Sequence, residues 1–163
     1  MRERAVTQGR IEAVLGASPG RRMIGVGSLA ALGAIMLYMA AALSPGLGWQ
    51  VFQVALGSVA LWCAYRMWHA TAERLELTAA GLRSTDGRIL APMDEIVSVD
   101  RGVFAFKPSN GFMITLRSKG PFVWEPGLWW RIGRRVGVGG VTPGTPSKYM
   151  AEVIQARIDA REG

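Results

Sequence analysis

The chain has a single cysteine, Cys63, and a single histidine, His69, among its 163 residues. One cysteine cannot form a disulfide within the chain. One cysteine and one histidine cannot assemble a recognisable zinc cluster or a Cys/His catalytic pair. We interpret Cys63 as a membrane-buried thiol and His69, beside Trp68, as an interfacial surface residue. We therefore expect no metal ligands, no cofactor-binding residues and no catalytic residues, and a protein that is not an enzyme.

The chain also lacks a recognisable nucleotide-binding loop. Gly137-x-Gly139-Gly140 has neither the Gly-x-Gly-x-x-Gly spacing nor a Gly-Lys-Ser/Thr ending. We expect residues 133–146 to be a glycine-rich flexible connection instead. Asp94, Glu95 and Asp100 are close in sequence, but strand alternation would divide them between two faces, so they are interpreted as solvated charges.

Charge is missing altogether from Met23 to Tyr65, a run of 43 residues without Asp, Glu, Lys, Arg or His. This length suits two membrane crossings, since about 20 helical residues span the hydrocarbon core. Ser44-Pro45-Gly46-Leu47-Gly48 interrupts the run, because proline removes a backbone donor and glycine weakens a helix. The sequence predicts a two-helix transmembrane hairpin over residues 23–68, with helices at about 23–43 and 49–68 and a turn at 44–48.

Arginines flank this hairpin on both sides, and its turn carries no charge. Arg21 and Arg22 precede it, Arg66 lies in the last turn of its second helix, and Arg74 follows. The positive-inside bias therefore places both termini in the cytoplasm of an inner-membrane protein. A secretory signal peptide cleaved near Ala40-Ala41-Ala42 is the alternative, but such a segment has about 7 to 15 apolar residues and is not followed by a second span.

Small or polar residues recur at helical spacing in both predicted helices. They are Gly27, Ala31 and Ala34 in the first helix, and Gln53, Gly57, Ala60 and Ala64 in the second. Small residues allow close backbone approach in lipid, so we expect the two stripes to face each other. The alternative is that one stripe docks on another membrane protein, which would make the chain an accessory subunit of a larger inner-membrane complex.

The first 22 residues form a basic cytoplasmic arm. Ile11, Val14, Leu15 and Ser18 share one face if this segment is helical, with arginines around them. A basic amphipathic segment beside a membrane commonly lies along the interface. The alternative is that the arm only determines the topology of the hairpin.

Residues 69–163 are expected to form one cytosolic domain, because short alternating segments follow the hairpin. Asp86-Gly87 and Pro108-Ser109-Asn110-Gly111 have the composition of hairpin turns. Met150, Val153, Ile154, Arg157 and Ile158 predict a final helix over about 147–161. The expected fold class is a membrane α-helical hairpin plus a mainly β domain of six or seven short antiparallel strands, a curled sheet or partial barrel closed by that helix. Strands are expected at 74–78, 96–99, 103–106 and 112–117. Residues 82–83 and 89–90 flank the Asp86-Gly87 turn, and 121–124 and 128–132 are the candidates for the last strands.

This order of elements resembles small bacterial membrane proteins with a pleckstrin-homology-like (PH-like) domain. The resemblance covers about Arg22 to Arg161 and includes a Leu-Thr-x-x-Gly-Leu start at Leu77–Leu82 and the turn at Asp86-Gly87. It implies a binding or scaffolding module, and no ligand motif transfers with it.

The segment from Arg117 to Arg135 is the candidate membrane or partner surface, because it interleaves cations with aromatic rings. Aromatic rings favour the membrane interface and cations favour anionic headgroups, while Trp and Arg are also enriched at protein-binding hot spots. If some tryptophans instead fill the core, the arginines are solvated charges. Nucleic acid ranks below lipid, because the bilayer offers phosphate at higher local concentration. We expect noncatalytic binding of anionic lipid or a protein partner; a membrane enzyme with an unrecognised site is the remaining alternative. The candidate residues are Arg117, Lys119, Trp124, Trp129, Trp130, Arg131, Arg134 and Arg135.

Overall fold

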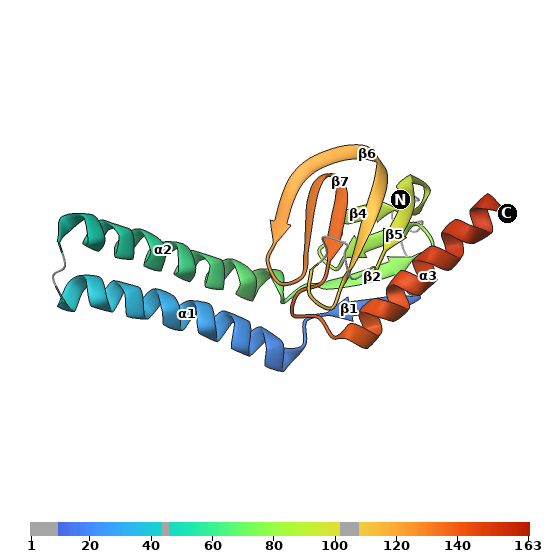
Figure 1. The fold of residues 1–163 in the computed structure, drawn as a ribbon. Helices are drawn as coiled ribbons and strands as arrows, with labels where there is room; N and C mark the ends of the chain where they lie inside the picture. The colour runs from blue at the N-terminus through green and yellow to red at the C-terminus, as the bar shows by residue number, and fades with distance from the viewer. Residues whose placement is uncertain (1–9, 44–45, 102–107) are drawn as a thin grey trace, which may run out of the picture.

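The computed structural model describes residues 10–43, 46–101 and 108–163, and it consists of a long helical hairpin joined to a β domain (Figure 1). The hairpin is made of α1 (Pro19–Ala42) and α2 (Leu47–Ala70). The β domain ends in the helix α3 (Gly144–Glu162). Its strands are β1 (Ala13–Gly16), β2 (Arg74–Thr78), β3 (Gly81–Ser84), β4 (Ile89–Pro92), β5 (Ile96–Asp100), β6 (Phe112–Glu125) and β7 (Trp129–Val138).

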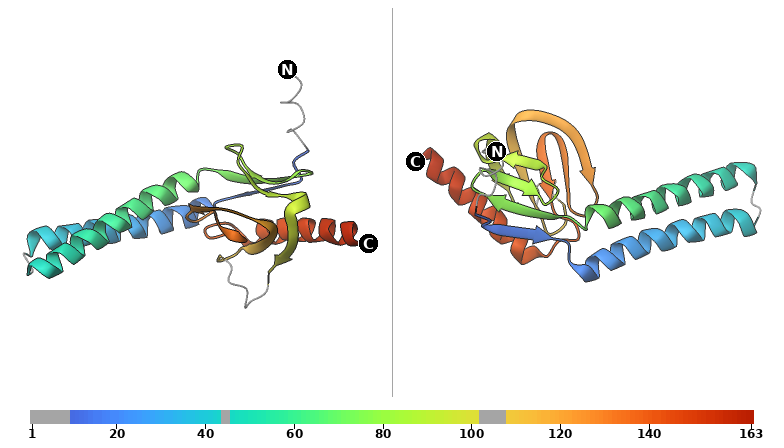
Figure 2. Two further views of the ribbon diagram at one scale, coloured as in Figure 1. Left: turned by 90° about the horizontal axis from the view of Figure 1, so that it is seen from above. Right: turned by 180° about the vertical axis from the view of Figure 1, so that it is seen from behind.

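Both predicted apolar helices are present, and each has 24 residues. They project away from the β domain, and the views in Figures 1 and 2 agree on this. Both are long and apolar enough to cross a membrane, by length and composition. Only 11% of the most apolar 18-residue stretch of α1, and 22% of that of α2, is buried within the chain. The core helix of a soluble protein would be mostly buried, so these helices do not have that role here.

The two helices approach each other closely at a pair of glycines. A Cβ atom added to Gly33 would lie 2.9 Å from the backbone oxygen of Gly57, and one added to Gly57 would lie 3.0 Å from that of Gly33. The predicted second-helix stripe, Gln53, Gly57, Ala60 and Ala64, is buried. On α1 the buried positions are Gly33 and Ala40. Gly27, Ala31 and Ala34 are exposed, which corrects their expected placement against α2.

The segment before α1 also differs from the expected amphipathic face, because residues 13–16 form a strand. β1 pairs with β2 in antiparallel register, with Leu15 opposite Leu75. Ala13 and Leu15 are buried in the core, whereas Val14 is 45% exposed, so the periodicity is that of a strand. The arm thus contributes to the β domain, and the helical hairpin is inserted between two neighbouring strands of one sheet.

The strands form two antiparallel sheets, ordered β1-β2-β3-β4 and β5-β6-β7. Within the described residues these sheets do not close into one barrel, so the expected mainly β domain is present in a more open form. Side chains from both sheets and from α3 make one hydrophobic core. Met150, Ile154 and Ile158 supply the buried face of α3, in agreement with the predicted apolar stripe. Arg157, also in that stripe, pairs with Glu12 and donates a 2.9 Å hydrogen bond to the Thr78 carbonyl oxygen.

Several predicted boundaries change. Residues 112–117 and 121–124 belong to one 14-residue strand, β6. Residues 133–138, expected to be loop, continue β7. Gly87 has φ +90° in the predicted Asp86-Gly87 turn between β3 and β4, which confirms it. The strand predicted at 103–106 lies outside the described residues.

Candidate membrane or partner surface

The candidate surface is carried by β6 and β7, which form a strongly bent ribbon (Figure 1). Thr115 lies opposite Arg135 and Glu125 lies opposite Trp129. Between these two pairs β6 advances by ten residues, from 115 to 125, whereas β7 advances by only six, from 129 to 135. Extra residues in one strand are β-bulges, which bend a strand pair and increase its twist. β6 thus becomes the outer strand of an arch.

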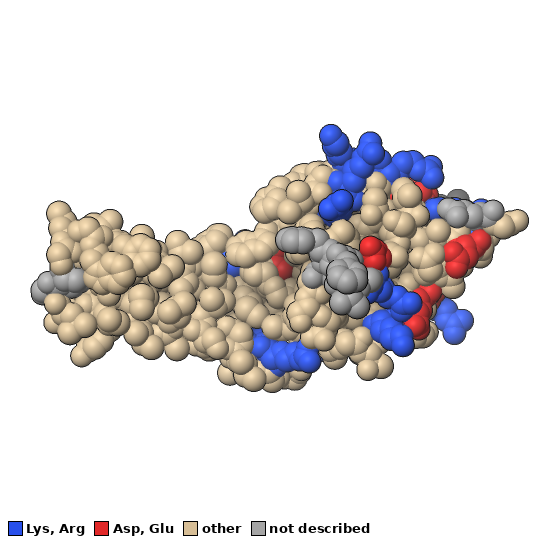
Figure 3. Space-filling model, viewed as in Figure 1, with Lys and Arg blue, Asp and Glu red and all other residues tan. Residues whose placement is uncertain are grey.

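Four of the predicted cations lie on this arch and are exposed. Arg117 and Lys119 belong to the bulged part of β6, and Arg134 and Arg135 belong to β7. None of the four forms an ion pair within the part of the chain that the structure describes. Figure 3 shows Lys and Arg side chains gathered over the arch, while the visible face of the helical hairpin is almost free of charge. We call Arg117, Lys119, Arg134 and Arg135 the basic crest.

The bulge under the basic crest is fixed by an acidic side chain from the turn before β5. The backbone N–H of Ser118 donates a 3.0 Å hydrogen bond to Glu95 Oε2. Hydrogen bonds from the Ser118 side chain and backbone lower the pKa of Glu95, with smaller contributions from the charges of Arg117 and Arg131. Glu95 is thus an ionised anchor for the loop that displays Arg117 and Lys119.

The other predicted residues are not on the crest. Trp129 is 4% exposed and belongs to the core, so it cannot contact a bilayer or a partner. Trp130 is partly buried and covers Gly137, where an added Cβ would lie 2.3 Å from the indole ring. Arg131 is partly buried, and its Nη1 donates a 3.4 Å hydrogen bond to the Leu90 carbonyl oxygen. The structure therefore separates the exposed cations from most of the tryptophans.

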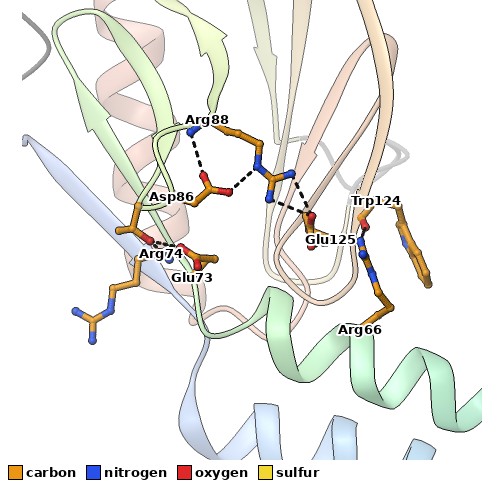
Figure 4. A network of polar contacts seen from close by, with 8 residues as sticks. Arg66, Glu73, Arg74, Asp86, Arg88, Trp124 and Glu125 are labelled. Carbon is orange, nitrogen blue, oxygen red and sulfur yellow. Dashed lines mark hydrogen bonds and ion pairs between the residues drawn. The ribbon is translucent and has the colours of Figure 1, made fainter. Parts of the chain in front are cut away.

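Trp124 connects the ribbon to the helical hairpin. Its ring lies 5.8 Å, centroid to centroid, from the ring of Trp62 on α2. Its carbonyl oxygen accepts a 2.9 Å hydrogen bond from Arg66 Nη2. The end of β6 is thereby held alongside the last turns of α2, in the neighbourhood that Figure 4 shows.

A chain of charges extends this connection to the other sheet (Figure 4). Glu125 lies 3.6 Å from Arg66 Nη2 and 3.3 Å from Arg88 Nη1. Arg88 also pairs with Asp86 at 2.5 Å. Partial burial alone would raise the pKa of Asp86, but hydrogen bonds and charge from Arg88 outweigh it and lower that pKa. The pairing also raises the pKa of Arg88, so both groups are charged around neutral pH.

Two apolar side chains lie on the arch: Phe122, an aromatic residue of the Arg117–Arg135 segment, and Ile132, which sequence reasoning did not place on the surface. Gly120 pairs with Gly133 and Val123 pairs with Arg131, so Pro121 and Phe122 together oppose Ile132. Phe122 is 71% exposed and Ile132 is 57% exposed. The alternation at 121–124 predicted a strand, but not the bulge that turns Phe122 outwards.

Among the described residues, no group of three or more His, Cys, Asp or Glu side chains is placed to hold a metal ion. His69 is exposed, and its ring lies 4.4 Å from that of Tyr65. No protein-family model, curated protein or solved structure matches the chain.

Proposed function

We propose that the chain is a noncatalytic lipid-binding module of a bacterial inner membrane, anchored by α1 and α2 and binding anionic headgroups through the basic crest. The observation that carries this proposal is the crest itself: four exposed cations on a ribbon tied to α2. Each Lys or Arg near an anionic bilayer contributes on the order of 1 kcal/mol to binding. The order of elements, with antiparallel sheets followed by a C-terminal helix, supports a PH-like domain.

The position of the hairpin supports a cytoplasmic domain. β1 and β2 are hydrogen-bonded neighbours, so the start of α1 and the end of α2 must lie on the same side of any membrane that the helices cross. Arg21 and Arg22 at the start of α1, and Arg66 at the end of α2, favour the cytoplasmic side for both ends. A cleaved signal peptide fits poorly, because cleavage would remove β1 and the fully buried Leu15 from the sheet.

Lipid binding is tested with the full-length chain, since β1 belongs to the domain. Fluorescent phosphatidylglycerol and phosphatidylcholine analogues are titrated against the protein in neutral detergent micelles. We expect preference for the anionic analogue, and Arg134→Gln with Arg135→Gln should weaken its binding by about 30-fold, since two charges contribute about 2 kcal/mol. Arg74→Gln with Lys148→Gln is the control, because it removes the same charge from exposed positions outside the arch.

Equal binding of both analogues, or equal losses in the two double variants, would contradict specific headgroup binding by the crest. Capture of a stoichiometric acidic protein by the crest, lost in the Arg134/Arg135 variant without any lipid preference, would assign the same surface to a protein partner.

One observation favours a second candidate function, an accessory subunit of a larger membrane complex. Gly27, Ala31 and Ala34 form an exposed stripe on α1, and Gly27 has open space around its missing Cβ. Such stripes let another transmembrane helix approach closely. Gly27→Leu should then abolish stoichiometric copurification of a membrane protein in mild detergent, while Leu32→Ala on the same helix should not.

A further inference from the structure

We infer that the limb of the arch carrying Phe122 and Ile132 inserts into the bilayer interface beside α2 as a lateral apolar anchor. The inference rests on the membrane location proposed above for the hairpin, but not on the binding of anionic lipid. Single exposed apolar residues are common on protein surfaces. Here the argument comes from where the pair lies relative to the uncharged part of α2.

The depth of Phe122 and Ile132 relative to the membrane follows from the pairing of β6 with β7. Trp124 and Trp130 are directly opposite each other, and Phe122 and Ile132 are each two residues further along their strands. Two strand residues span about 7 Å. Trp124 contacts Trp62, which lies four residues, or about 6 Å, before Arg66 and within the uncharged run of α2. Phe122 and Ile132 are therefore near the level at which charge disappears from the helix.

The ribbon is held firmly at this level. Arg66 donates to the Trp124 carbonyl oxygen at 2.9 Å, and Glu125 pairs with Arg66. The β6–β7 turn packs on the end of α2, where a Cβ added to Gly127 would lie 3.0 Å from Thr71 Cγ2. The Val141 N–H also donates a 3.0 Å hydrogen bond to the Gly127 carbonyl oxygen. These contacts fix the turn and the Trp124–Glu125 end of the ribbon beside α2.

The occupant of this surface is the lipid that surrounds α2. Trp62 is 53% exposed on the helix next to the limb, so the apolar surface of the limb continues that of a lipid-facing helix. The cations of the basic crest follow on the same strands beyond the apolar pair. An apolar edge followed by cations matches the order of acyl region and headgroups in a bilayer, and aromatic residues are enriched at that boundary.

The test uses full-length protein with Cys63→Ser, carrying one new cysteine labelled with the fluorophore NBD. Protein with Phe122→Cys, or separately Ile132→Cys, is reconstituted into nanodiscs of zwitterionic phosphatidylcholine with a nitroxide near the headgroup end of the acyl chain. Each label should emit at shorter wavelength than a label in water, and lipid nitroxide should quench it at least twofold. Ala160→Cys, exposed near the far end of α3, should show neither effect (Figure 1).

A fourth site, Leu32→Cys in the middle of α1, separates the possible failures. For this site the nitroxide is placed deep in the lipid acyl chain. If it quenches the Leu32 label while the labels at 122 and 132 behave like the label at 160, the hairpin is inserted and the anchor does not exist. If the Leu32 label is unquenched, the proposed membrane location fails together with the anchor. Short-wavelength emission at 122 without lipid quenching would show that protein, rather than lipid, covers the limb, and would also overturn the inference.

Discussion

The close contact between Gly33 and Gly57 predicts that replacing Gly33 by alanine destabilises the packing of α1 against α2. In Gly33→Ala, the new methyl group would lie 2.9 Å from the Gly57 backbone oxygen and 2.6 Å from Leu61 Cγ. The Leu61 side chain can change its rotamer, but a helix backbone cannot move alone. Ordinary contact begins at 3.4 Å, so the helices must separate by about half an ångström, the difference between 3.4 and 2.9. A gap of that size forfeits about a quarter of each dispersion contact along the interface.

Gly27→Ala is the matched control on the same helix. Gly27 is exposed and has nothing within 4 Å of an added Cβ. Both substitutions give the same gain in helix propensity, up to about 1 kcal/mol, so the difference between the variants isolates the packing effect. Overpacking of a tight contact costs about 1 to 3 kcal/mol. We therefore expect the Gly33 variant to be less stable than the Gly27 variant by that amount.

The free energy of unfolding can be measured by SDS titration in mixed micelles, followed by circular dichroism and tryptophan fluorescence. Equal stability of the two variants, or a larger loss for Gly27→Ala, would refute the reasoning. The second result would mean that Gly27, as the sequence spacing implied, makes the closer contact.

Three further predictions concern the β domain. Leu15→Ala should lower the free energy of unfolding by about 2 to 5 kcal/mol, because Leu15 is fully buried in β1, while the exposed Val14→Ala should change it little in the same chemical denaturation. Glu125→Gln removes two partly exposed ion pairs and should cost about 1 kcal/mol, with faster amide exchange at the β6–β7 turn by mass spectrometry, and Glu152→Gln is its exposed control. Because the pKa of Asp86 is lowered in the folded chain, its stabilising effect is present above its unfolded pKa and is lost as pH falls through its folded pKa. Stability measured from pH 6 to pH 2 should therefore fall less steeply in Asp86→Asn than in the unaltered chain, and parallel curves would contradict this.

The sequence predicted the elements that are governed by one strong local signal. Met23–Tyr65 lacks charge, and a run of that length has few alternatives to a helical hairpin. Gly87 adopts positive φ in the turn that its Asp-Gly composition predicted. The apolar spacing of Met150, Ile154 and Ile158 places the buried face of α3 correctly, because a helix against a core must alternate at that period.

Other features depend on contacts between distant segments. β1 has only four residues, and Val14 and Leu15 fit a helical face until pairing with β2 selects the strand. Ser118-Lys119-Gly120-Pro121 has the composition of a turn, yet the register with β7 converts it into bulges within one strand. Gly137 was expected in a loop, but it lies in β7, at a position where the Trp130 ring leaves no room for a side chain.

The helix faces were ambiguous for a different reason. Lipid and a neighbouring helix are both apolar, so hydrophobicity does not show which side of α1 meets α2. Gly27 and Gly33 are equally small, and only the geometry of the hairpin brings Gly33 against Gly57. The candidate surface was ambiguous in the same way, because interleaved Trp and Arg residues do not reveal that Trp129 is core and Arg134 is exposed.

Insertion of the hairpin between β1 and β2 couples its assembly to that of the domain. Gly16 and Arg74 are register partners, although the whole hairpin lies between them in sequence. Closing a flexible loop of that length has an entropic cost, which two packed antiparallel helices reduce by bringing their ends together. Any change that separates α1 from α2 should therefore also loosen β1 from the sheet. Amide exchange in β1 should accordingly be faster in Gly33→Ala than in Gly27→Ala, although both substitutions lie far from the strand.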